Sequence, residues 1–255
     1  MKKEKKVKPK TQIFAILVVD DDPLMAKSLV DILNVKDFQA EAVNSGEEAL
    51  ALLKQKTFDC LLTDIKMPII DGVELSRRSK EIQPSLNVIL MTAYAAEEKT
   101  DQALAEGAVT IVEKPIDINI ILRFLSTLQD KCFITIIDDD PNFCKTLRDI
   151  LKCRHFNVDL ICDPHNVIES ISSETQVILL DLKLNSINGV DVLREVRKNN
   201  PTLPVILITG FQKEMTSIVE SAYKLNAFTC LNKPVEIEDL ILSINRVRYH
   251  QLIAI

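Results

Sequence analysis

Five polar residues in the first half of the chain stand where predicted strands end, and together they could carry out phosphoryl chemistry. Asp20 and Asp21 follow IFAILVV, Asp64 ends CLLTD, Thr92 ends NVILMT and Lys114 follows VTIVE. The carboxyl ends of parallel strands meet at one edge of a sheet, so these side chains are expected to converge. Gathered carboxylates repel each other unless a cation joins them, and a few hard oxygen ligands suit Mg²⁺. A carboxylate beside Mg²⁺ and a lysine can attack a phosphoryl group and form an aspartyl phosphate.

The same set of residues occurs again in the second half of the chain. DDDP, the two central acids, the VIL-x-T strands and the KP dipeptides recur at offsets of 117 to 119 residues. Four motifs that share one offset indicate a duplicated domain, because a period of this size far exceeds that of solenoid repeats. The second set consists of Asp138, Asp139, Asp181, Thr209 and Lys233.

Strands and helices are predicted to alternate within each half. Short apolar, β-branched runs are typical of buried strands, and amphipathic stretches separate them. This alternation predicts a parallel doubly wound sheet covered by helices. In the first half the predicted strands cover 13–19, 39–43, 59–64, 87–93 and 109–113, and the helices cover 24–34, 45–56, 73–82, 97–107 and 117–129.

The motifs DDDP, DIKMPIIDG, MTAY and EKP resemble the signature of the response-regulator receiver domain. The resemblance implies two tandem flavodoxin-like α/β domains, each a five-stranded parallel sheet in the order 2-1-3-4-5 flanked by five helices. The expected organisation is a basic disordered tail at 1–11, a first receiver at 12–130, and a second receiver at 132–255 with an extended C-terminal helix.

The resemblance also implies Mg²⁺-dependent transfer of a phosphoryl group from a histidine kinase to the central aspartate. Asp64 and Asp181 would be the phosphoacceptors. Mg²⁺ would be bound by these aspartates together with the preceding acid pairs and a backbone carbonyl from the following loop. In the first domain the implied ligands are Asp20, Asp21 and the Lys66 carbonyl, and the implied phosphoryl contacts are Thr92 and Lys114, which stands before a Pro115 expected to be cis. In the second domain the implied ligands are Asp138, Asp139 and the Lys183 carbonyl, and the implied contacts are Thr209 and Lys233, which stands before Pro234.

Three positions depart from the family pattern. Ile111 and Cys230 stand where the family often has an aromatic switch residue. The loop after Asp181 reads LKLNSING and lacks Met-Pro, although it keeps the eight-residue spacing from aspartate to glycine. The second domain therefore matches the receiver pattern less closely than the first.

The residues that tune phosphate loss in the family also lack a group to position water. Lys66 and Tyr94 occupy these positions in the first domain, and Lys183 and Phe211 in the second. None offers a carboxylate or an amide, so slow self-dephosphorylation is the expected behaviour.

Composition indicates a protein with an aliphatic core and a basic start. Apolar residues make up 47% of the 255, Trp is absent, and the net charge is −6 although residues 1–10 contain six lysines. No apolar run approaches the roughly 18 residues of a membrane span. No C-x-x-C pair occurs, which favours reduced packing thiols in a cytoplasmic protein. The cysteines are Cys60, Cys132, Cys144, Cys153, Cys162 and Cys230, and the histidines, predicted to be surface residues, are His155, His165 and His250.

The residues after Pro234 suffice for one long helix and no DNA-binding or catalytic output domain. Residues 236–255 keep apolar residues at a helical period beyond what one receiver needs. This helix could pack on its own domain or serve as a homodimerisation or docking helix together with the last strand. The expected partners are a histidine kinase or histidine phosphotransfer protein, with no DNA binding and no membrane insertion.

The first interpretation is a phosphorelay protein that is no enzyme beyond its own phosphorylation and dephosphorylation. A second is a Mg²⁺-dependent aspartyl phosphohydrolase, but such enzymes usually carry an acid two residues after the nucleophile, where Lys66 and Lys183 stand here. A scaffold with a silent second receiver and the receiver end of a hybrid sensor kinase are also compatible with the motifs.

Overall fold

The computed structural model describes residues 14–93, 103–163, 167–185, 187–210 and 216–253. Internal contacts divide the chain into two compact units, Met1–Leu122 and Arg123–Ile255. No helix among the described residues combines the length and apolar character needed to cross a membrane. The predicted tail at 1–11 and most of the predicted helix at 97–107 lie outside the described residues.

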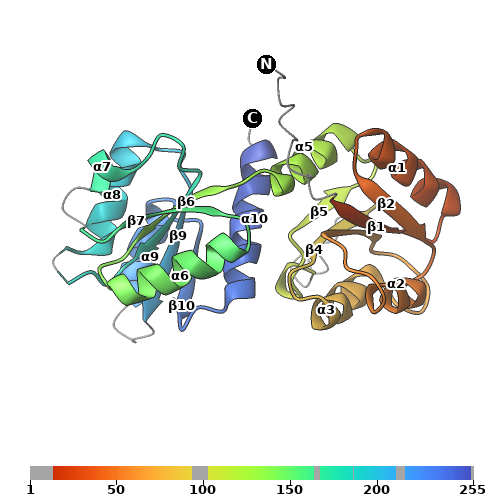
Figure 1. Ribbon diagram of the computed structural model, residues 1–255, viewed down its shortest axis with the longest axis horizontal. Coiled ribbons are helices and arrows are strands. Elements are labelled where there is room, and N and C mark those ends of the chain that lie inside the picture. Colours follow the sequence, from red (N-terminus) through yellow and green to blue (C-terminus); the bar gives the residue numbers. More distant parts are fainter. Residues whose placement is uncertain (1–13, 94–102, 164–166, 186, 211–215, 254–255) are drawn as a thin grey trace, which may run out of the picture. The chain divides into compact units, whose positions relative to one another are not determined.

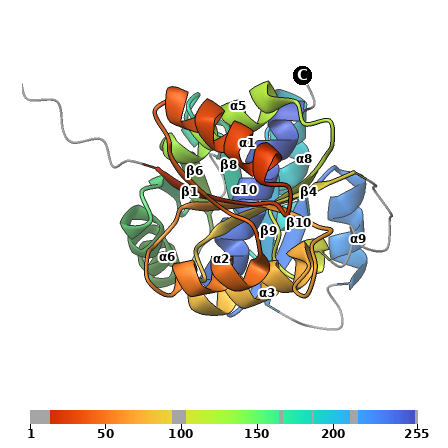
Figure 2. The ribbon, with the colours of Figure 1, turned by 90° about the vertical axis from the view of Figure 1, so that its right-hand side faces the viewer.

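The first unit contains a fully parallel sheet in the order β2-β1-β3-β4-β5. Figure 2 shows α1 and α5 on one side of this sheet and α2 and α3 on the other. The strands are β1 (Ala15–Val19), β2 (Gln39–Val43), β3 (Cys60–Asp64), β4 (Asn87–Thr92) and β5 (Thr110–Glu113), and the helices are α1 (Pro23–Val35), α2 (Gly46–Leu53), α3 (Gly72–Ile82) and the start of α5 (Ile118–Gln129).

Local sequence explains where these helices begin. Asp22 caps α1 by accepting the N–H groups of Leu24 and Met25, and Pro23 occupies the first helical turn. Pro fits there because the missing N–H would have no partner in that turn. The Ser45 side chain accepts the Glu48 N–H at the start of α2. These two caps therefore start α1 and α2 soon after the ends of β1 and β2, close to the predicted site.

The second unit repeats this architecture. Its sheet is also parallel, in the order β10-β9-β8-β6-β7, which is the predicted 2-1-3-4-5 order read from the other edge (Figure 1). The strands are β6 (Phe133–Ile137), β7 (Asn157–Ile161), β8 (Val177–Asp181), β9 (Val205–Gly210) and β10 (Thr229–Lys233), and the helices are α6 (Pro141–Cys153), α7 (Val167–Ser170), α8 (Gly189–Asn199), α9 (Thr216–Lys224) and α10 (Ile237–Ile253).

Both faces of the second sheet are covered. One cluster joins the sheet to α6 and α10 through residues such as Leu147 and Ile244. The other joins it to α7, α8 and α9 through residues such as Leu193 and Ala222. Every residue of the central strand β8 is buried, including Asp181. A strand buried on both faces reads as a continuous apolar run, which is why the sequence pattern identifies it.

The last helix packs within its own unit. Leu240 and Ile244 of α10 belong to the core cluster, and other residues of the helix contact the segment that begins this unit. The Tyr249 ring meets the Phe124 ring edge-on at 5.1 Å. The Arg248 guanidinium donates to the backbone carbonyls of Thr127 and Asp130. The described part of this helix therefore contacts both the core of the second sheet and residues 124–130.

The prediction that the cysteines are packing residues is wrong for two of the six. Cys60, Cys132 and Cys144 are buried and Cys230 is half-buried, but Cys153 and Cys162 are exposed. Cys153 is the last residue of α6, and Cys162 follows the edge strand β7. The ends of helices and strands lead into surface loops, so they face solvent even when the neighbouring sequence is apolar.

Candidate functional site

In the first unit, a lysine bridges two buried carboxylates at the carboxyl ends of the strands. The Lys114 amine lies 2.8 Å from Asp20 Oδ2 and 2.8 Å from Asp64 Oδ1. Both acids are more than nine-tenths buried. Asp20 follows β1, Asp64 ends β3 and Lys114 follows β5, so three strands position the cluster. A buried carboxylate needs such a partner, because leaving an ionised group unpaired in the interior is costly.

The backbone around Asp64 is held close by a glycine. Asp64 Oδ2 accepts the Lys66 N–H at 3.1 Å, and the Gly72 N–H donates to the Ile65 carbonyl at 2.9 Å. A Cβ at position 72 would lie 2.2 Å from the Asp64 carbonyl oxygen. Only glycine allows α3 to approach the acid this closely. The eight-residue spacing from aspartate to glycine therefore has a steric cause.

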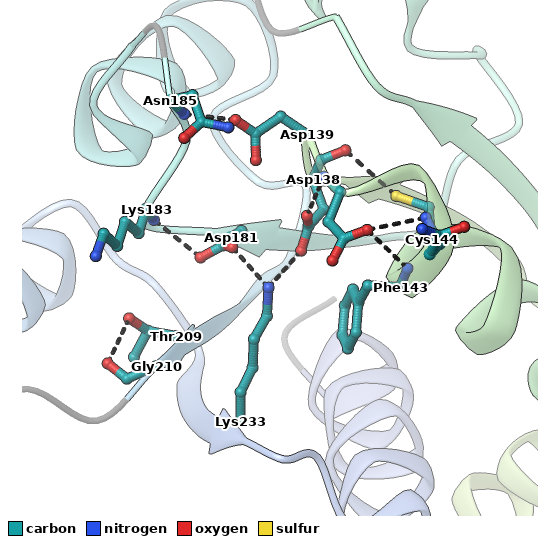
Figure 3. A network of polar contacts seen from close by, with 12 residues as sticks. Asp138, Asp139, Phe143, Cys144, Asp181, Lys183, Asn185, Thr209, Gly210 and Lys233 are labelled. Atoms are coloured by element: carbon teal, nitrogen blue, oxygen red, sulfur yellow. Dashed lines mark hydrogen bonds and ion pairs between the residues drawn. The ribbon is translucent and has the colours of Figure 1, made fainter.

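The second unit contains the same bridge, with an aromatic ring beside it (Figure 3). The Lys233 amine lies 2.6 Å from Asp138 Oδ2 and 2.7 Å from Asp181 Oδ2. It also lies 4.2 Å from the centre of the Phe143 ring, a distance at which an ammonium is attracted to the ring face. A Cβ at Gly189 would lie 2.5 Å from the Asp181 carbonyl oxygen, so the same steric constraint acts in both units.

The second acid of each pair behaves differently from the first. Asp21 is exposed, whereas Asp139 is half-buried and accepts the Asn185 N–H at 2.5 Å (Figure 3). Asn185 lies in the loop after Asp181, which departs from the family pattern. Sequence reasoning missed this contact, because the two residues are 46 positions apart and the donor is a backbone group.

The carbonyl of the first acid also accepts a hydrogen bond in each unit, from a different donor. The Asn44 amide donates to the Asp20 carbonyl at 2.9 Å. The Cys144 thiol donates to the Asp138 carbonyl at 3.3 Å. Sequence reasoning missed both donors. Asn44 and Cys144 stand out in the sequence only when the two repeats are aligned and the residues around the two acid pairs are compared.

Electrostatics at the bridges reflect burial and pairing together. Burial alone would lower the pKa of the Lys114 amine, but hydrogen bonds to Asp20 and Asp64 outweigh it, so this pKa is raised. The pKa of the Lys233 amine is raised in the same way beside Asp138 and Asp181. Both amines therefore carry a charge at neutral pH, and each offers a positive group to an anion.

The predicted site residues are brought together in part. Three residues of each predicted set converge, and the threonines lie on neighbouring strand ends, where Thr92 and Thr209 are buried. Thr209 Oγ1 donates to the Gly210 carbonyl at 3.4 Å. The Lys66 and Lys183 side chains are exposed. Tyr94 and Phe211 lie outside the described residues, and both Lys114–Pro115 and Lys233–Pro234 are cis.

The donor set fits a small hard cation incompletely. Within the described ranges, no three His, Cys, Asp or Glu side chains form a metal-binding group. In each unit two buried carboxylates nevertheless offer hard oxygens at one sheet edge. Mg²⁺ typically takes one or two carboxylates and keeps several waters or a phosphate oxygen, so a small protein donor set is sufficient.

Known proteins share the sequence features of both units. The family described as "Response regulator receiver domain" matches residues 16–126 and 134–245. A response regulator receiver protein of Anaeromyxobacter sp. (strain Fw109-5) is 29% identical over 231 residues, 91% of this chain and 94% of that protein. The transcriptional regulatory protein ZraR of Klebsiella oxytoca is 36% identical over 126 residues, 49% of this chain and 28% of ZraR.

Solved structures include single domains of the same kind. A receiver domain protein (CheY-like) from Methanospirillum hungatei JF-1 is 29% identical, with a TM-score of 0.45 over 47% of this chain and 95% of its own. The family matches together cover most of the chain, once in each half. The chain therefore belongs to the response regulator receiver domain family and contains tandem receiver domains of two-component signalling.

Proposed function

We propose that this protein accepts phosphoryl groups on Asp64 and Asp181 and passes the signal on by protein contacts. The donor is a histidine kinase, a histidine phosphotransfer protein or a small phosphodonor. The observation that carries the proposal is the lysine bridge, present in both units at 2.6 to 2.8 Å between the amine and two strand-end carboxylates. Such a cluster presents a nucleophile and a cation at one sheet edge.

In the proposed reaction, one Asp64 carboxylate oxygen attacks phosphorus. The bond from phosphorus to the donor nitrogen or oxygen breaks, and the donor atom keeps the electron pair. The Lys114 amine, 2.8 Å from the nucleophile's carboxylate, offsets negative charge on the phosphoryl oxygens. Lys233 has the same role beside Asp181.

Mg²⁺ is the expected cofactor at each site. Asp20, Asp21, Asp64 and the Lys66 carbonyl would hold it in the first domain, and Asp138, Asp139, Asp181 and the Lys183 carbonyl in the second. When bound, the ion neutralises charge between the acid pocket and the phosphoryl group. The acids themselves fix its place, because burial leaves Asp20 and Asp64 little freedom to move.

The proposed switch uses the buried threonines. A phosphoryl group on Asp64 would draw the Thr92 hydroxyl toward it, and one on Asp181 would draw Thr209. The phosphoryl group can shift a domain from one conformation to another only if its contacts differ between the two conformations. The contact with the threonine hydroxyl would supply this difference. The signal would reach the face built from the fourth helix, fifth strand and fifth helix of each domain.

Residues 12–130 and 132–255 are assigned to the two receivers, with 1–11 as a basic tail. The family matches at 16–126 and 134–245 lie inside these limits. The proposal includes a cytoplasmic location and excludes DNA contact. Homodimerisation through the last helix is a weaker part of it, because Leu240, Ile244 and Tyr249 of α10 are already buried within the single chain.

A scaffold with a silent second receiver is the second candidate. The hydrogen bond from the Asn185 N–H to Asp139 favours it, because it ties one oxygen of this carboxylate to the loop, whereas Asp21 in the first unit is exposed. A phosphohydrolase has less support, because Lys66 and Lys183 stand where a general acid is needed and their side chains are exposed.

Phosphoryl uptake tests these candidates directly. Wild type, Asp64→Asn, Asp181→Asn and the double variant are incubated with acetyl phosphate and Mg²⁺, and intact mass counts the added groups. Two additions to wild type, one to each single variant and none to the double variant are expected. Uptake on Asp64 alone would identify a silent second receiver, and no uptake in a reaction that labels another receiver domain would refute the proposal.

A further inference from the structure

Two cysteines of the second unit lie beside the first acid of the acidic site. The Cys144 thiol donates to the Asp138 carbonyl at 3.3 Å (Figure 3). Burial raises the pKa of this thiol, and the nearby Cys162 raises it further. Cys144 is fully buried on α6, and Cys162 is exposed. One thiol of the pair is therefore reachable from solvent and the other is not.

Strand pairing places the two cysteines together independently. Ile137 of β6 pairs with Ile161 of β7, and the Asp138 N–H donates to the Ile161 carbonyl at 3.3 Å. Cys162 is the next residue after Ile161, so it lies beside Asp138. Because Cys144 contacts the Asp138 carbonyl, both cysteines belong to one small region around the first acid of the site.

The first unit has no thiol at either position. The repeat aligns Cys144 with Ala26 and Cys162 with Asn44. Ala26 is buried, and Asn44 donates its amide to the Asp20 carbonyl at 2.9 Å. The same carbonyl is thus satisfied by an amide in one unit and by the Cys144 thiol in the other. Cys162 stands at the position from which the Asn44 side chain reaches this carbonyl in the first unit.

We propose that Cys144 and Cys162 are a redox-sensitive pair that closes into an intramolecular disulfide when a hydroperoxide reaches Cys162. Thiol pairs that become disulfides in reducing compartments are usually regulatory or catalytic. An exposed thiol next to a second thiol has the arrangement of a sensor cysteine with its resolving partner.

The chemistry balances with hydrogen peroxide as the oxidant. The Cys162 sulfur attacks one peroxide oxygen, the O–O bond breaks, and the products are a sulfenic acid and water. The Cys144 sulfur then attacks the Cys162 sulfur, and hydroxide leaves and takes the Cys144 proton as a second water. The two sulfurs lose two electrons in total, and the peroxide gains them.

The disulfide removes a donor from the acidic site. Once oxidised, Cys144 no longer donates to the Asp138 carbonyl, and Asp138 is a bridging acid of the second site. Loss of an outer-shell hydrogen bond typically lowers metal affinity or activity by roughly 10-fold or more. This consequence rests on the proposed function, whereas formation of the disulfide does not.

The first test concerns the bond itself. The full chain is treated with hydrogen peroxide, with Cys153→Ser as background to prevent links between chains through the other exposed thiol. Proteolysis and mass spectrometry are expected to find a linked Cys144–Cys162 peptide pair that has lost two hydrogen atoms and is restored by dithiothreitol. The matched control is C144A/C162N, which installs the residues of the first unit. Oxidation of Cys162 to sulfinic acid without any link to Cys144 would overturn the proposal.

The second test concerns the site. Reduced and oxidised protein are compared for phosphoryl uptake from acetyl phosphate, with each aspartate read separately. Oxidation is expected to slow uptake on Asp181 by roughly 10-fold and leave uptake on Asp64 unchanged. C144A/C162N should show no response to peroxide at either aspartate. A linked protein with unchanged uptake on Asp181 would overturn the effect on the site, and absence of uptake in the reduced protein would instead count against the function proposed for the second unit.

Discussion

The two acidic sites contain the same lysine bridge but differ in the residues that surround it. In the first unit, Asp20 is held by an amide from Asn44, and Asp21 is exposed. In the second unit, a thiol takes the place of the amide, and Asp139 is engaged by the loop backbone at Asn185. The duplication thus preserved the lysine and the two bridged acids and allowed the supporting hydrogen bonds to change.

This difference separates two requirements of the fold. The bridge and the glycine after each central acid are present in both units, because charge pairing and steric fit tolerate no substitute there. The supporting contacts need only a donor of suitable length, so amide, thiol and backbone N–H can replace one another. Differences in activity between the units should therefore originate in the supporting contacts.

The largest effect is expected from removing the bridging amine. Lys114→Met and Lys233→Met each leave two buried carboxylates without their cation, and uptake on the adjacent aspartate should fall by about 100- to 1000-fold. Intact mass after acetyl phosphate treatment measures this. Lys56→Met and Lys198→Met, which break exposed ion pairs, are the matched controls. Equal losses in variants and controls would show that the bridge has no special role.

The next largest effect concerns the glycines. Gly72→Ala and Gly189→Ala place a methyl group 2.2 and 2.5 Å from the carbonyl oxygen of the central acid, so each should lower the free energy of unfolding by about 1–3 kcal/mol. Urea denaturation followed by circular dichroism measures this. Gly210→Ala, with nothing within 4 Å and Ala93 at the aligned position, should change stability by less than about 0.5 kcal/mol. A destabilised Gly210→Ala would argue against the steric explanation.

A smaller effect distinguishes the two bridges. Phe143 lies under Lys233, whereas the aligned residue in the first unit is Met25. A double-mutant cycle with Phe143→Met and Lys233→Met, measured as the free energy of unfolding in urea, should give a coupling energy of about 0.5–1 kcal/mol. The same cycle with Met25→Ala and Lys114→Met should give a value near zero. Equal coupling in both units would mean that the ring adds nothing specific to the second site.

The smallest effect lies at the opposite end of the sheet and depends on pH. Asp59 accepts the Ala15 N–H at 2.7 Å, while the aligned Gln176 accepts the Phe133 N–H at 3.3 Å. Burial raises the pKa of Asp59 above 3.8, and the Ala15 hydrogen bond opposes this only in part. The folded state thus holds the proton more tightly, so stability falls as pH rises through the folded pKa.

Asp59→Asn removes this charge and copies the neutral amide of the second unit. The variant should be slightly more stable than wild type at pH 7, and the difference should shrink as pH approaches 3.8. Urea midpoints at several pH values measure it. A difference that does not vary with pH would show that packing, and not ionisation, separates the two side chains.

The sequence pattern alone predicted the parallel α/β architecture, the strand-end positions of the acids and the duplication, whereas the sheet order came from the resemblance to the receiver family. Buried parallel strands such as CLLTD are continuous apolar runs, and a carboxylate at their end stands out against them. The helix caps at Asp22 and Ser45 are also local features, since capping is an interaction between residues a few positions apart. These features depend on periodicity and short-range hydrogen bonds, which the order of residues contains.

Only the tertiary structure decided which groups touch. Lys114 meets Asp20 across 94 residues, and Asn185 meets Asp139 across 46. Convergence at a sheet edge does not specify a hydrogen-bond partner, because several polar groups of similar reach share that edge. The exposure of Cys162 beside buried Cys144 follows from an edge strand and a helix that pack together, which no local pattern encodes. Local order therefore determined the positions of the site residues, and long-range packing selected their partners.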